Sequence, residues 1–152
     1  METLVDAKKH LRDNWEKGTE CPCCGQMVKL YKRRLNSAAA LYLIDLLKKS
    51  GGKAGVAVHI TEIGKASTSG GSFAQLAHWD LIKPIHNTDT SKRTSGQWCI
   101  TAKGVDFVRG TITVPAYTFQ FDGKCLGSSD ERISIKQAQG VKFDYSDLMA
   151  GV

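Results

Sequence analysis

The sequence predicts an α+β protein. Apolar residues recur every three or four positions over residues 3–17 and 38–49, which is the spacing of one helix face. Short apolar segments separated by turn signals, as over 111–135, are typical of strands. A chain of 152 residues, 41% of them hydrophobic, can bury a core in one domain with extensions or in two very small domains. Three consecutive parts are predicted, with the bounds 1–34, 35–110 and 111–152.

The first predicted helix, residues 3–17, is amphipathic. Its apolar stripe consists of Leu4, Ala7, Leu11 and Trp15. The stripe can pack on the body of the protein or on a second copy, so we expect that the helix assists formation of a homodimer. The first twenty residues lack the apolar run of a signal peptide, and no stretch approaches about 18 apolar residues. We therefore expect a cytoplasmic protein with no membrane partner.

Three of the five cysteines lie in the segment CPCCG, residues 21–25. In a cytoplasmic chain such clustering indicates metal binding before disulfides. The two-residue gap lets the sulfurs of Cys21 and Cys24 face one ion, while Cys23 points away. The segment resembles the CPxCG turn of zinc ribbons, which implies a structural zinc ion.

A structural zinc ion takes four ligands, and the sequence has no second CxxC pair. Asp122 and Cys125 repeat the gap, with a glycine two residues later, and are the candidate third and fourth ligands. Two CPCCG turns from two subunits can instead share one ion. The remaining alternative is a turn that holds no metal.

The strongest helix signal covers residues 38–49. Asn36 or Ser37 can cap its start, and Gly51-Gly52 stops it. Its apolar face consists of Ala40, Leu43, Ile44 and Leu47. Ahead of the helix, residues 26–31 alternate as a strand, and the basic run Lys32-Arg33-Arg34 follows.

Residues 51–110 alternate between helix and strand signals. The expected elements are an extended stretch at 56–59, helices at 61–66 and 72–79, strands at 81–86 and 97–100, and a helix at 102–108. Thr101 is expected to cap the last helix. The loop at 87–96 between the two strands is polar and basic at its tip.

Two fragments of this region resemble winged helix-turn-helix proteins. The first follows the pattern in which a helix runs into its wing, with the residues Leu76, Trp79, Asp80, Leu81 and Ile82. Asp80 replaces the usual glycine, which is tolerable because Asp enters the left-handed region more readily than most residues. In the second fragment, Thr101 and Gly104 match the threonine-x-x-glycine signature of MarR-like and phage-borne members.

The resemblance implies a regulator of transcription or of a mobile element that binds double-stranded DNA. The net charge of +6 suits that partner, because it is +4 over residues 1–50, +3 over 51–110 and −1 over 111–152. The candidate DNA-contacting residues are Lys65, Ser69, Ser72, Gln75, His78, Lys83, Lys92 and Arg93.

Five of these candidates have a specific chemical reason. Gln75 can pair bidentately with adenine, and Ser69 and Ser72 suit phosphate contacts. Lys92 and Arg93 at the loop tip can contact phosphate or enter the minor groove. The alternative is a phage-type adaptor or inhibitor that docks on a host protein, because residues 71–81 contain no Lys or Arg.

The last part, residues 111–152, is expected to be rich in short strands and can pack with the cysteine turn. The strands are expected at 111–114, 117–121, 124–126 and 132–135, with a short helix at 144–149. Asp122-Gly123 is a hairpin signal. We expect no enzyme, because the four histidines are scattered and no known catalytic motif is present.

Overall fold

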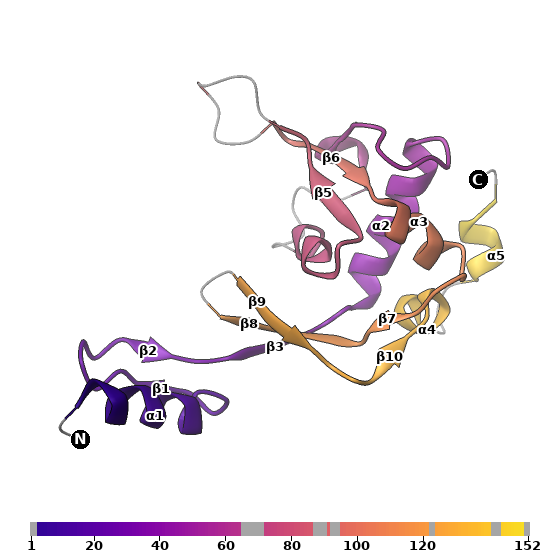
Figure 1. The fold of residues 1–152 in the computed structure, drawn as a ribbon. Helices are drawn as coiled ribbons and strands as arrows, with labels where there is room; N and C mark the ends of the chain where they lie inside the picture. Colours follow the sequence, from indigo (N-terminus) through magenta and orange to yellow (C-terminus); the bar gives the residue numbers. More distant parts are fainter. Residues whose placement is uncertain are drawn as a thin grey trace. The chain divides into compact units, whose positions relative to one another are not determined.

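A computed structural model describes residues 3–64, 72–86, 91, 95–121, 124–140 and 144–150. The chain is of the predicted α+β class (Figure 1). It divides into two compact units: unit 1 comprises residues 1–34 and 117–129, and unit 2 comprises residues 35–116 and 130–152. Whereas the sequence suggested a single C-terminal part, residues 117–129 group with the N-terminal segment and the rest with unit 2.

In its described residues, unit 1 combines one helix with two small sheets. Its elements are α1 (Leu4–Asn14), β1 (Thr19–Glu20), β2 (Met27–Val28), β3 (Tyr31–Arg34), β8 (Tyr117–Phe121) and β9 (Lys124–Ser128). Strands β1 and β2 form an antiparallel hairpin, and a separate three-stranded sheet has the order β3-β8-β9. Helix α1 begins after Thr3, whose side chain accepts a hydrogen bond from the Asp6 amide. Leu4 stays 63% exposed, and of the predicted stripe only Ala7 is buried.

Unit 2 contains the larger core. Its elements are α2 (Ser37–Lys49), β4 (Val58–His59), η1 (Ile60–Glu62), η3 (Ala74–Trp79), β5 (Ile82–Pro84), β6 (Gln97–Ile100), α3 (Ala102–Val108), β7 (Val114–Pro115), β10 (Arg132–Ile133), α4 (Ile135–Gln139) and α5 (Tyr145–Leu148). An antiparallel sheet has the order β4-β6-β5, and β7 pairs with β10. Figure 1 shows β5 and β6 side by side.

Helix α2 is the centre of that core. The Asn36 side chain accepts a hydrogen bond from the Ala39 amide at 2.8 Å, as expected of a cap. All four residues of the predicted apolar face are buried: Ala40, Leu43, Ile44 and Leu47. Helix α2 contacts α3, α4, β6 and η3. Helix α2 therefore organises unit 2.

The sequence predictions for residues 26–34 and 132–135 need correction. The strand expected over 26–31 is broken, because Val28 pairs with β1 whereas Tyr31 pairs with β8 in the other sheet. The basic run that was expected to follow this strand forms β3 itself. The strand expected over 132–135 ends at Ile133, because Ser134 and Gln137 form a capping box that starts α4.

Candidate functional site

Within the segment predicted as a helix over 72–79, residues Ala74–Trp79 form a 3-10 helix, η3, rather than an α-helix. A 3-10 helix repeats every three residues, so it presents three rows of side chains. The row Phe73, Leu76 and Trp79 is buried. The row Ser72, Gln75 and His78 is half-buried, and Ala74 is exposed. The predicted contact residues thus share one row that reaches the surface.

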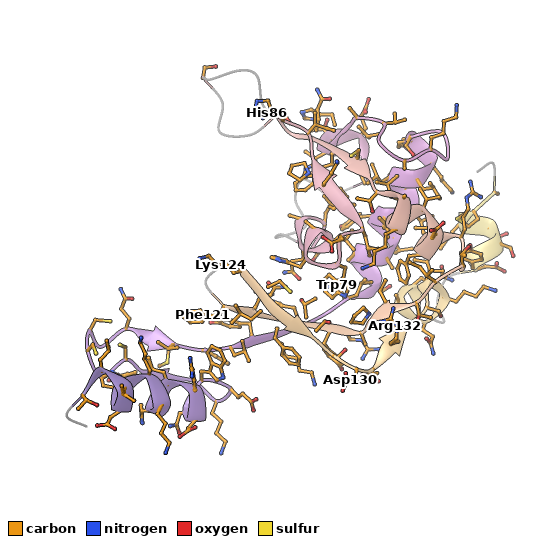
Figure 2. All side chains as sticks on the ribbon, in the orientation of Figure 1. Trp79, His86, Phe121, Lys124, Asp130 and Arg132 are labelled. Carbon is orange, nitrogen blue, oxygen red and sulfur yellow. The ribbon has the colours of Figure 1, made fainter. Side chains whose placement is uncertain are left out.

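A ring–ring contact and a hydrogen bond, each made by an aromatic side chain of the buried row, hold η3 in place. The Phe73 ring meets the Trp98 ring of β6 edge-on, with centroids 5.5 Å apart. The indole of Trp79, which is labelled in Figure 2, donates a hydrogen bond of 2.7 Å to the carbonyl oxygen of Pro115. Because both contacts come from the buried row, they set the rotation of η3 and turn Gln75 toward the surface.

The turn after η3 has the left-handed conformation that the sequence predicted for Asp80, with φ 60° and ψ 24°. Thr101 caps α3 by accepting from the Gly104 amide, and its hydroxyl donates to the Asp80 carbonyl at 2.6 Å. Gly104 lies so close to the Leu81 carbonyl that a Cβ atom there would be 2.2 Å from the oxygen. The Thr101–Gly104 signature therefore joins the turn to α3.

The β5–β6 hairpin carries Lys83 on an exposed position opposite Cys99. At the hairpin end of these strands, the Ser95 hydroxyl donates to the Ile85 carbonyl at 2.8 Å, and the Ile85 amide donates to Gln97. Cys99 is buried. Four other predicted contact residues lie outside the described residues, namely Lys65, Ser69, Lys92 and Arg93.

The CPCCG turn closes the β1–β2 hairpin. The Cys21 amide donates to the Gln26 carbonyl, and the Gly25 amide donates to the Cys21 carbonyl, both at 2.8 Å. Hydrogen bonds from the amides of Cys23 and Cys24, and from the Cys24 thiol, lower the pKa of the Cys21 thiol. Gly25 has a φ of +75°, which favours glycine. The turn thus stabilises a thiolate at Cys21.

Of the two remaining candidate ligands, the structure describes only Cys125. Cys125 is exposed on β9, and its thiol donates to the Gly127 carbonyl. Asp122 lies outside the described residues. Within the described ranges, no three His, Cys, Asp or Glu side chains form a group that could hold a metal ion. His10 and His59 instead contact the hydroxyls of Thr19 and Thr61.

No known protein family matches this chain. No curated protein and no solved structure matches it either. Across the described residues, every helix is too short or too polar to cross a membrane.

Sequence reasoning missed a second candidate surface, on unit 1. All four residues of β3, Tyr31–Arg34, are exposed, and three of them are cations. The available signal was the segment KLYKRR, residues 29–34, in which four cations surround one aromatic residue. The segment forms this surface only together with Tyr117 of β8. The Arg34 guanidinium donates a hydrogen bond of 3.0 Å to the Tyr117 hydroxyl.

Proposed function

We propose that unit 2 is a winged helix-turn-helix domain that binds double-stranded DNA, in a cytoplasmic regulator of transcription or of a mobile element. The observation that carries the proposal is the order of elements. Helix α2, strand β4, the short helices η1 and η3, and the hairpin β5–β6 follow one another, with the sheet order β4-β6-β5. In this layout η3 takes the place of the recognition helix and the hairpin takes the place of the wing.

The dimensions of η3 support this use. At about 2.0 Å per residue, its six residues span roughly 12 Å, comparable to the width of the major groove. Its half-buried row offers the amide of Gln75 for adenine and the hydroxyl of Ser72 for phosphate. Lys83 adds a cation on β5.

The test of this proposal is titration of the whole protein with random-sequence duplex at two salt concentrations. Binding to DNA phosphates should weaken steeply as salt rises, because each contact releases condensed counterions. A lack of duplex binding at about 50 mM salt would refute the proposal. That outcome would favour the second candidate, a module that docks on another protein, which the absence of Lys and Arg over residues 71–81 already supports.

Replacing Lys92 and Arg93 together by Ala is expected to weaken duplex binding for all sequences alike. Each lost phosphate contact lowers the slope of log affinity against log salt by about 0.9, so the double variant should lose about 1.8. The matched control is Lys48→Ala with Lys49→Ala, which removes the same charge from the end of α2. Equal slopes for the two variants would remove residues 92 and 93 from the interface.

We also propose that the CPCCG turn holds a structural zinc ion through Cys21 and Cys24. The turn fits two thiolate ligands, since backbone amides bond the Cys21 sulfur as in zinc-binding turns. Asp122 and Cys125, or the turn of a second copy, would complete the coordination. Pairing of two copies through α1 fits the exposure of Leu4 and Val5.

Replacing Cys21 and Cys24 by Ser is expected to release about one zinc ion per chain, or one per dimer if the ion is shared. Elemental analysis of the purified protein measures the effect. Cys23→Ser is the matched control and should retain the metal, because this exposed thiol is not one of the pair. Zinc-free untreated protein would end the metal proposal.

A further inference from the structure

The three-stranded sheet of unit 1 has one face on which aromatic rings and cations alternate. Residues directly opposite each other in an antiparallel pair share a face. Lys32 lies opposite Phe119, and Arg34 lies opposite Tyr117. On the other side of β8, Phe121 lies opposite Lys124 (Figure 2). A central row of three rings therefore has cations on both neighbouring strands.

These rings are still open to solvent. Tyr117, Phe119 and Phe121 are all half-buried, while the cations beside them are exposed. Gly127 lies opposite Phe119 on β9 and adds no side chain to this face. The ring of Trp15 borders the row at its far end, 6.1 Å from the Phe121 ring.

The cations are held against the rings. The Lys32 ammonium lies 4.1 Å from the centroid of the Tyr117 ring, and the Arg34 guanidinium lies 5.5 Å from it. Tyr31 and Arg33 lie opposite Gln120 and Thr118 and so on the other face, where Lys29 and Arg33 lie 5.5 and 5.7 Å from the centroid of the Tyr31 ring. Cation–π attraction over these distances orders long side chains that would otherwise move freely. Charge and ring are thus presented together.

The positive charge of unit 1 is concentrated in β3 and the two residues before it. Residues 29–34 carry four Lys or Arg and no acid, whereas the rest of unit 1 carries five against six Asp or Glu. Beside β3, a pocket of about 360 Å³ is lined by Gln26, Met27, Val28, Lys29, Tyr31 and Phe121. A pocket with two aromatic walls and one cation suits a planar base with its phosphate.

We propose that this face of the β3-β8-β9 sheet binds a single-stranded nucleic acid. Lys32 and Arg34 of β3 contact the phosphates, and bases stack on the β8 row of Tyr117, Phe119 and Phe121. One further base enters the pocket that Tyr31 and Phe121 line. A single strand fits better than a duplex, because only unpaired bases expose faces on which aromatic side chains can stack. This site is separate from the duplex site proposed for unit 2.

The test measures binding of a labelled oligomer of about 12 nucleotides, as oligo-dT and as oligo-U, to the whole protein by fluorescence anisotropy. Lys32→Gln with Arg34→Gln should lower the slope of log affinity against log salt by about 1.4. Lys8→Gln with Lys9→Gln is the matched control, since it removes equal charge from exposed positions of α1 in the same unit. Equal losses for the two pairs would overturn the proposal.

Stacking of the base that enters the pocket is tested at Tyr31, which lines the pocket, is 49% exposed and can be changed without opening a core. Tyr31→Ala should weaken oligomer binding by roughly 5- to 150-fold, whereas Tyr31→Phe keeps the ring and should bind nearly as the wild type. Inorganic polyphosphate carries charge but no bases and should bind equally well to both variants. Indifference of oligomer binding to Tyr31→Ala would overturn the proposal.

Two further measurements distinguish binding at this site from binding at the duplex site. The double Ala variant of Lys92 and Arg93 should keep oligomer binding while losing duplex affinity. If that variant loses oligomer binding instead, the single strand binds to unit 2 and the proposal fails. A preference between oligo-dT and oligo-U identifies the strand as DNA or RNA. If neither oligomer binds at low salt, the proposal is also refuted.

Discussion

Leu76→Ala is expected to lower the free energy of unfolding of unit 2 by about 2–5 kcal/mol. Leu76 is fully buried in the inner row of η3, so truncation loses its burial and leaves a cavity. Urea unfolding followed by tryptophan fluorescence measures the loss. Trp79 and Trp98 belong to unit 2 and Trp15 to unit 1, so replacing Trp15 by Phe isolates the signal of unit 2.

The matched control for this prediction is Gln75→Ala, one residue earlier on the half-buried row. It should change the free energy of unfolding by less than about 1 kcal/mol, since it leaves no core cavity. The same change should weaken duplex binding if Gln75 contacts a base. Equal destabilisation by the two substitutions would contradict the three-row arrangement of η3.

Gly104→Ala is expected to destabilise unit 2 by about 1–3 kcal/mol. The new Cβ atom would lie 2.2 Å from the Leu81 carbonyl oxygen and 2.7 Å from the Ile100 Cγ1 atom. Because the nearest atom belongs to the backbone, α3 must move away from the turn at Asp80 and Leu81. The better helix propensity of Ala recovers only about 0.5–1 kcal/mol.

Thermal unfolding measures this effect. For a domain of 60–100 residues, each kcal/mol lowers the Tm by roughly 4–8 °C. Lys103→Ala is the control, since the neighbouring position is exposed and the same helix accepts Ala there. A Tm for Gly104→Ala at or above that of the control would show that α3 does not pack closely on the Leu81 backbone.

Sequence patterns correctly predicted those elements whose signals all lie within one short segment of the chain. Helix α2 was predicted because its cap, apolar face and glycine stop all lie within some fifteen residues. The left-handed turn at Asp80 and the cap of α3 at Thr101 were predicted for the same reason. Strands β8 and β9 followed from alternation around a hairpin signal.

Predictions failed where pairing partners are distant in the sequence. The segment 26–31 alternates as one strand, yet its two halves pair with β1 and with β8 in different sheets. The type of helix at η3 was also missed. Over so short a span, the spacing of Phe73, Leu76 and Trp79 fits both an α-helix and a 3-10 helix. In the observed 3-10 helix, Phe73 contacts Trp98 and Trp79 contacts Pro115.

The amino-acid sequence by itself determined the α+β class, the helix that organises unit 2, the excess of positive charge and the cysteine turn, because periodicity, composition and spacing are local properties. Only the tertiary structure decided that residues 117–129 join the N-terminal segment in unit 1. The same pairing aligns the cations of β3 with the rings of β8. Strand register joins residues more than eighty positions apart, and neither strand alone specifies its partner.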